Sequence, residues 1–184
     1  MPVPTLETKQ LILRAFTLAD AKRVQHLAGA FVVADTTGHM PHPYKDGMAE
    51  EWLGGLDSEF EHGEGATFAI TLRATGELIG AIGLTIQSHN KRAEMGYWLG
   101  VPYWNHGYAS EAARAILQFA FEQLNLNRVY ASHFPRNPAS GRVMQKIGMK
   151  YEGTLRQHFV RWTDPEDLVY YGILKSEWRR TTNL

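Results

Sequence analysis

The 184-residue chain contains no cysteine, which excludes disulfide bonds, Cys-ligated zinc sites and thiol catalysis. Its 19 basic residues (Lys and Arg) balance its 19 acidic ones, so zero net charge gives no basic field for direct nucleic-acid binding. The apolar runs are too short to span a membrane. Residues 1–5 lack the apolar core of a signal peptide, so we expect a cytoplasmic protein.

Two glycine signatures of nucleotide-binding proteins are also missing. The chain has no Gly-x-x-x-x-Gly-Lys-Ser/Thr and no Gly-x-Gly-x-x-Gly, which excludes a P-loop and a Rossmann dinucleotide site. His39 and His42 have a spacing that would suit a metal, but they lie among Gly38, Pro41 and Pro43 in a predicted loop. We therefore expect no metal site.

Length and composition suit one enzyme domain over residues 1–184. The chain is 44% hydrophobic and has no repeat, linker or low-complexity block. A chain of this size buries about 70% of the surface that its unfolded form exposes.

The apolar pattern predicts an α/β fold of the α+β kind, with a mixed, mostly antiparallel sheet. The predicted strands are residues 10–16, a hairpin over 67–86 that turns at 74–77, a strand through Glu94, residues 128–133 and a last pair up to Lys175. One predicted helix begins after a capping signal at Thr17 and Asp20. Three others occupy residues 46–61, 109–124 and 138–147. A helix between two consecutive strands implies one parallel pair.

The most informative segment is residues 97–124. An aromatic, strand-like stretch breaks at Pro102 and turns through residues 104–109 into a long amphipathic helix. The first N–H groups of a helix lack intrahelical partners and lie at the positive end of its dipole. Because Gly107 lets the backbone come close to a ligand, this turn indicates a phosphate site, although any strand-to-helix connection can carry a glycine.

A second motif follows the strand-like residues 128–133. Asn137 suits a helix N-cap, Pro138 the first helical position and Gly148 the residue after the helix. Capping alone does not require the pairing of Asn137-x-x-Ser140 with a phosphate-type turn one helix and one strand upstream. With that pairing the chain resembles the GNAT N-acetyltransferase superfamily, and within it the RimJ/RimL type, which acetylates protein N-termini, notably of ribosomal proteins.

The resemblance covers nearly the whole chain. Residues 6–14 are similar to the family's opening strand, 93–99 to its fourth strand, 103–112 to its pyrophosphate loop and 148–153 to the start of its sixth strand. It implies a GNAT-like central sheet with a parallel, splayed strand pair and helices on both faces. It also implies acetyl-CoA as co-substrate.

Two positions depart from the wider superfamily. The loop motif often begins with Gln or Arg where this chain has Trp104, a change that the RimJ/RimL branch commonly shows. Many relatives carry, seven residues after the motif Asn, a tyrosine that protonates the departing thiolate, and that position is Met144 here. A thioether has no proton to donate, so the role passes to Ser140, to water or to no group.

Glu94 is the candidate base. Acetyl transfer needs a neutral amine, whereas a peptide α-amino group has a reference pKa of about 7.7 to 8.0 and is largely protonated at neutral pH. In the resemblance this acid often acts through a water molecule. The alternative is an ordinary strand-surface carboxylate beside Arg92.

The resemblance also implies a set of cofactor contacts. Leu99 and Val101 would pair with the pantetheine arm, backbone N–H groups near Leu99 would steady an oxyanion, and Asn137 would orient the cofactor. His106 would add charge near the phosphates or be a solvated turn residue. The remaining expected contacts are Trp104, Asn105, Gly107, Tyr108, Ala109 and Met144.

The acceptor is the open part of the prediction. Residues 46–64 carry seven acids and no Lys or Arg, which is either a solvated helix face or an acidic rim for basic peptides. A protein N-terminus is the favoured acceptor. A small-molecule acetyltransferase acting on polyamines, amino sugars or antibiotics and a non-catalytic acyl-CoA-binding module remain alternatives, and a homodimer stays open.

Overall fold

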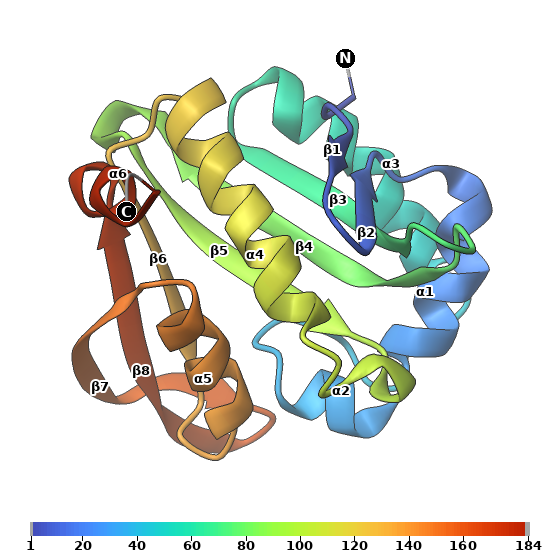
Figure 1. Cartoon of the computed structure of the whole chain (residues 1–184). Coiled ribbons are helices and arrows are strands. Elements are labelled where there is room, and N and C mark those ends of the chain that lie inside the picture. Colours follow the sequence, from blue (N-terminus) through green and yellow to red (C-terminus); the bar gives the residue numbers. More distant parts are fainter. Residues whose placement is uncertain (1, 183–184) are drawn as a thin grey trace.

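The centre of the computed structural model, which describes residues 2–182, is an eight-stranded sheet in the order β1-β2-β3-β4-β5-β6-β8-β7 (Figure 1). The strands are β1 (Leu6–Glu7), β2 (Leu11–Arg14), β3 (Gly65–Leu72), β4 (Leu78–Gln87), β5 (Arg92–Leu99), β6 (Arg128–His133), β7 (Lys150–Arg161) and β8 (Asp164–Leu174). All neighbouring pairs are antiparallel except β5 and β6. The predicted mixed, mostly antiparallel sheet with one parallel pair is therefore confirmed.

Helices cover both faces of this sheet, as predicted. They are α1 (Ala21–Ala28), α2 (Phe31–Asp35), α3 (Met48–Glu61), α4 (Tyr108–Gln118), α5 (Pro138–Lys146) and α6 (Lys175–Thr182), with short 3₁₀ turns at Leu18–Asp20, Ser88–Asn90 and Val101–Tyr103. Figure 1 shows α4 and α5 in front of the sheet and α1 and α3 behind it. No helix in the described part of the chain has the length and apolar character needed to cross a membrane.

Strand alternation divides the core between the two faces. On β5, Met95 and Leu99 are buried in the cluster that includes α4, whereas Trp98 packs on the cluster formed by α1 and α3. Ala112 and Ala113 of α4 are fully buried, and such small side chains let the helix lie close to the sheet. Neighbouring residues of β5 therefore face different compartments.

Four element predictions were wrong or incomplete. The opening strand is two strands, because the Thr8 hydroxyl accepts from the Leu11 N–H, the Thr8 N–H donates to the Leu11 carbonyl oxygen, and the chain reverses there. The long helix ends in a wider π turn at Phe119–Gln123, which buries Phe119 against Phe68. The short α2 interrupts the predicted loop, and the sequence pattern gave no indication of α6.

Glu111 connects the start of α4 to the sheet edge. Its carboxylate accepts hydrogen bonds of 2.7 Å from the Thr8 hydroxyl, the Gln10 N–H and the Gln10 side-chain amide. Burial opposes ionisation, but these bonds outweigh it and lower the pKa of Glu111. The first turn of α4 is thereby held against the β1–β2 turn.

We expect Glu111→Gln to lower the free energy of unfolding by about 1 to 2 kcal/mol at neutral pH, because an amide cannot accept all three bonds. A lowered folded-state pKa gives stability that is present above the unfolded value and lost as pH falls through the folded value. The deficit measured by urea unfolding should therefore shrink in acid. Glu122→Gln, which removes the charge of an exposed carboxylate that accepts one bond from Gln118, should change stability by less than about 0.5 kcal/mol. Equal deficits for both variants would contradict this anchoring role.

Candidate active site

The candidate site opens where β5 and β6 separate. The two strands pair over only three residue pairs, ending at Glu94 with Tyr130. Beyond them β5 stays with β4, and β6 stays with β8. Figure 1 shows the two strands diverging, with α4 and α5 beside the gap. The gap belongs to a cavity of about 1460 Å³ that both strands line.

The turn before α4 presents unpaired backbone donors to this cavity. The φ angle is 83° at Gly107 and 63° at Asn105, and these left-handed conformations turn the chain into α4. Within the described chain, none of the backbone N–H groups of residues 105–110 has a protein acceptor. A Cβ atom on Gly107 would meet no protein atom within 4 Å. Free N–H groups in the turn and in the first helical residues, Tyr108 to Ser110, suit an anionic ligand.

Trp104 connects this turn to the edge of β5. Its indole N–H donates to the Leu99 carbonyl oxygen at 2.8 Å. The Gly100 N–H donates to Ile79 of β4, so by alternation the Leu99 N–H and C=O point to the opposite edge, into the gap. The Leu99 N–H is thus a strand donor that faces the cavity.

The N-terminus of α5 forms the facing wall. The Asn137 side chain caps the helix by accepting from the Ser140 N–H at 3.4 Å, and Pro138 takes the first helical position, as predicted. The Ser140 hydroxyl lies 2.8 Å from the Tyr97 hydroxyl. Met144 is 1% exposed and also lines the cavity.

Glu94 lies at the point of divergence. It is half-buried and accepts a hydrogen bond of 3.3 Å from the Ser132 hydroxyl of β6. Tyr170 of β8 also lines the cavity; burial raises its pKa and the negative charge of Glu94 raises it further. The Glu94 carboxylate thus lies near hydroxyl groups, and it has no ion pair with a Lys or Arg among the described residues.

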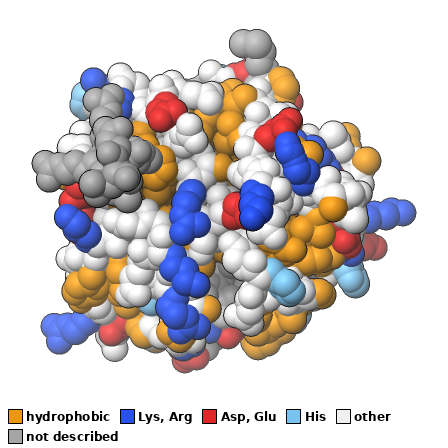
Figure 2. All heavy atoms as spheres, in the orientation of Figure 1, with side chains coloured by type: hydrophobic (Ala, Val, Ile, Leu, Met, Phe, Trp, Pro, Cys, Tyr) orange, Lys and Arg blue, Asp and Glu red, His pale blue; other side chains and the backbone are white. Residues whose placement is uncertain are grey.

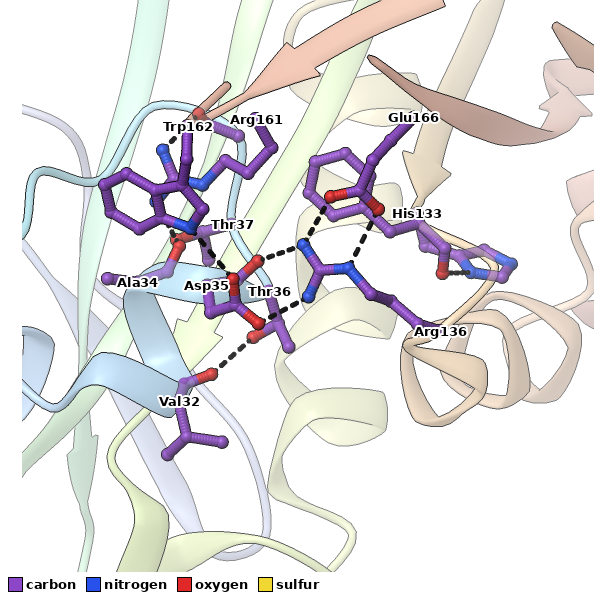
Figure 3. Close-up of polar contacts among 12 residues, drawn as sticks. Val32, Ala34, Asp35, Thr36, Thr37, His133, Arg136, Arg161, Trp162 and Glu166 are labelled. Carbon is purple, nitrogen blue, oxygen red and sulfur yellow. Dashed lines mark hydrogen bonds and ion pairs between the residues drawn. The ribbon is translucent and has the colours of Figure 1, made fainter. Parts of the chain in front are cut away.

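The far side of the cavity is closed by α2, the following loop and the tip of the β7–β8 hairpin. Arg161 is 6% exposed and donates to the carbonyl oxygens of Ala34, Gly38 and Met40. Figure 3 shows Arg161 beside Ala34. Burial lowers the pKa of Arg161, and its guanidinium carbon lies 3.8 Å from the centre of the Trp162 ring. The loop conformation thus depends on one buried guanidinium.

A second arginine joins the two walls. Figure 3 shows Arg136 between Asp35 of α2 and Glu166 of β8, with bonds of 2.6 Å and 2.7 Å to their carboxylates. The Trp162 indole also donates to Asp35 at 2.9 Å. Arg136 directly precedes Asn137, so this network links the α5 wall to the loop wall.

The cavity brings together all the predicted site residues except two. Val101 and His106 do not line it, and the His106 ring instead stacks on Tyr108 at 5.4 Å. The residues that do line it are Glu94, Leu99, Trp104, Asn105, Gly107, Tyr108, Ala109, Asn137, Ser140 and Met144.

The sequence reasoning missed several polar side chains here. Arg142 and Lys146 line the cavity from α5, and Arg114 of α4 donates to the Lys146 carbonyl at 3.0 Å. Figure 2 shows Lys and Arg side chains in a column over this boundary, beside a hollow. The i, i+4 spacing of Arg142 and Lys146 was a usable signal. Tyr97 was missed because the strand pattern alone does not reveal its contact with α5.

Comparison with known proteins gives consistent matches. A family model described as "Acetyltransferase (GNAT) domain" matches residues 10–150. "Uncharacterized N-acetyltransferase YoaA" of Bacillus subtilis is 31% identical over 175 residues, 94% of this chain and 97% of the relative. "Putative ribosomal N-acetyltransferase YdaF" of the same bacterium is 38% identical over 104 residues, 56% of this chain and 57% of the relative.

A solved structure shares the fold. RimL, a ribosomal L7/L12 α-N-protein acetyltransferase in complex with coenzyme A, superposes with a TM-score of 0.86 at 18% identity, covering 93% of this chain and 98% of RimL. At this identity the likeness shows the fold alone.

We expect Gly107→Val to abolish the rise in melting temperature that acetyl-CoA produces, because a ligand that binds only the folded state stabilises it. A β-branched side chain is disfavoured at positive φ and would enter the space in front of the free N–H groups. The measurement is thermal unfolding with and without acetyl-CoA.

Gly76→Val is the matched control. Gly76 has φ of 72°, its Cβ would also meet no protein atom within 4 Å, and it does not line the cavity. Both variants should lose intrinsic stability, but the control should keep the full ligand-induced rise. A full rise in Gly107→Val would contradict the assignment of this turn to a phosphate.

Proposed function

Since the chain belongs to the GNAT acetyltransferase family, we propose that it moves the acetyl group of acetyl-CoA to the N-terminal α-amino group of a protein, of the ribosomal type. One observation carries this proposal. A single cavity connects the unpaired N–H groups before α4, the carboxylate of Glu94 and the carboxylate of Glu51 on α3. Cofactor, base and acceptor would thus meet in one space.

The α4–α5 side is the proposed cofactor half. The N–H groups of residues 105–110 would bind the pyrophosphate, and the nearby column of Arg114, Arg142 and Lys146 would attract the cofactor's phosphates. The Leu99 N–H would pair with the pantetheine arm or steady the oxyanion. Asn137 would orient the cofactor and Met144 would pack against it. His106 and Val101, which lie outside the cavity, are weaker candidates for a contact.

Glu94 is the proposed base in a direct attack. The amine nitrogen attacks the thioester carbonyl carbon, the carbon–sulfur bond breaks and its electron pair stays on sulfur. Before this attack the acceptor ammonium gives one proton to Glu94 through water. As the amide forms, its nitrogen gives a second proton to solvent, and the thiolate takes a proton from solvent or stays ionised beside the Ser140 hydroxyl. The lack of a cationic partner for Glu94 in the described residues supports this role.

The acceptor half supports a basic peptide. Glu51 of α3 lines the cavity. A second hollow of about 420 Å³ contains Glu59 and Glu64 and shares Trp52 and Trp98 with the cavity. Carboxylates and indole faces together attract cations. The name of YdaF, a putative ribosomal N-acetyltransferase, adds support for a ribosomal acceptor.

A small-molecule amine is the second candidate. It is favoured by three aromatic side chains that line the cavity, Tyr44, Trp52 and Phe159. Free-thiol release from acetyl-CoA, measured with Ser- or Ala-initiated ribosomal-protein peptides, polyamines and aminoglycosides, separates the two. Peptide kcat/KM should exceed that of every small amine, and the reverse order would reject the proposal.

We expect Glu94→Gln to lower kcat on the order of a hundredfold while acetyl-CoA still binds, because the variant keeps the shape and removes the base. The defect should shrink as pH rises toward about 9, where more of the acceptor amine is neutral. Glu51→Gln is the control, since it removes a charge from the same cavity and should raise KM without this pH trend. A loss that is equal at every pH would assign Glu94 a positioning role.

We expect Glu51→Lys to raise KM for basic peptides several-fold, and Glu50→Lys to have little effect. The two residues are adjacent and exposed on α3, but only Glu51 lines the cavity. The effect should fade with salt, because exposed charges are screened over about 8 Å at physiological ionic strength. Kinetics at low and high salt measure it. Equal effects of both variants would leave the acidic segment as a solvated helix face.

A further inference from the structure

Tyr97 crosses the gap that the acetyl group would occupy. Strand alternation places Glu94 and Trp98 toward the acceptor half and Tyr97 toward α4 and α5. The Tyr97 hydroxyl lies 2.8 Å from the Ser140 Oγ and donates to the Ser140 carbonyl oxygen at 3.1 Å. These two contacts connect β5 to the first turn of α5.

The hydroxyl pair has two hydrogen-bond arrangements. In one, Ser140 donates to the Tyr97 oxygen and Tyr97 donates to the Ser140 carbonyl. In the other, Tyr97 donates to Ser140 Oγ, which leaves the Ser140 proton free for a third group. Within the described chain Ser140 Oγ has no other hydrogen-bond partner. A negative charge in the cavity next to Ser140 would therefore select the second arrangement.

We propose that Tyr97 is a positioning residue that turns the Ser140 hydroxyl toward the sulfur of coenzyme A and strengthens its hydrogen bond to the departing thiolate. The carbon–sulfur bond breaks, its electron pair remains on sulfur, and the Ser140 O–H donates a hydrogen bond to that sulfur without giving up its proton. The inference rests on the role proposed for Ser140 and is independent of the acceptor.

Tyr97 acts as a donor rather than an acid. Burial raises the pKa of the Tyr97 hydroxyl to about 12, and the hydrogen bond with Ser140 lowers this pKa by a smaller amount. An ordinary thiol has a pKa of about 8.5, so passing the phenol proton to a thiolate is unfavourable. The phenol keeps its proton and polarises Ser140. This arrangement supplies thiolate stabilisation in a chain that has Met144 where a tyrosine would stand.

The test uses coenzyme A alone, so neither the acceptor nor Glu94 enters. The thiol pKa of bound coenzyme A is read from the ultraviolet difference absorbance of the thiolate as pH is varied. It should lie below that of free coenzyme A in the wild type. Ser140→Ala and Tyr97→Phe should each raise it, by about one unit for Ser140→Ala, a tenfold change in the ionisation constant.

The double variant decides whether Tyr97 acts through Ser140. Tyr97→Phe combined with Ser140→Ala should give the same thiol pKa as Ser140→Ala alone, because the effects of coupled residues do not add. Additive shifts in the thiol pKa would overturn the proposal that Tyr97 acts through Ser140. An unchanged thiol pKa in Tyr97→Phe, or an unshifted one in the wild type, would overturn it as well. Glu94, Tyr108, His133 and Arg142 also line the cavity, and they are the same in every variant.

Tyr171→Phe controls for a loosened α5. The Tyr171 hydroxyl accepts from Gln145 of the same helix at 2.9 Å, and Tyr171 does not line the cavity. This variant should leave the bound thiol pKa unchanged. If it shifts that pKa as much as Tyr97→Phe does, the effect belongs to helix anchoring and the proposal fails. Ser140→Thr, which keeps a hydroxyl, should retain most of the wild-type shift.

Discussion

The separation of β5 from β6 after Glu94 is the constraint on which the site depends. A backbone polar group that is buried without a partner costs free energy, so parallel strands normally stay paired. Here each strand keeps its other neighbour, β4 or β8, and the pair diverges. The facing edges are left with unmatched donors and acceptors. A ligand that can pair with a strand edge satisfies them and stabilises the open arrangement.

In the proposed function the same strand would separate the two reactants. Because successive side chains of β5 point to opposite faces, Glu94 and Tyr97 face different halves of the cavity although three positions apart. Arg136 and Arg161 hold the surrounding walls, each by bonds to backbone or carboxylate oxygens from distant segments. The geometry of the site therefore rests on a few long-range polar contacts rather than on the local loops alone.

Features that depend on nearby residues in the sequence could be predicted from it. The turn into α4 and the Asn137 cap follow from glycine, proline and capping patterns over a few residues, and the parallel pair follows from the helix between two consecutive strands. The structure has each of them. The break after Thr8 was missed because it depends on a side-chain contact with Leu11 and on Glu111, about a hundred positions away. The bond between Tyr97 and Ser140 depends on a tertiary distance in the same way. Element types could thus be read from the sequence, whereas the contacts that complete the cavity could not.

Amide hydrogen exchange by NMR, with and without saturating acetyl-CoA, tests the central claim most directly. If the cofactor fills the gap between β5 and β6, the N–H groups of residues 105–110 and of Leu99 should become protected. The paired amides between β7 and β8 should change little. Protection confined to other surfaces, with residues 105–110 exchanging as fast as in the free protein, would contradict the account.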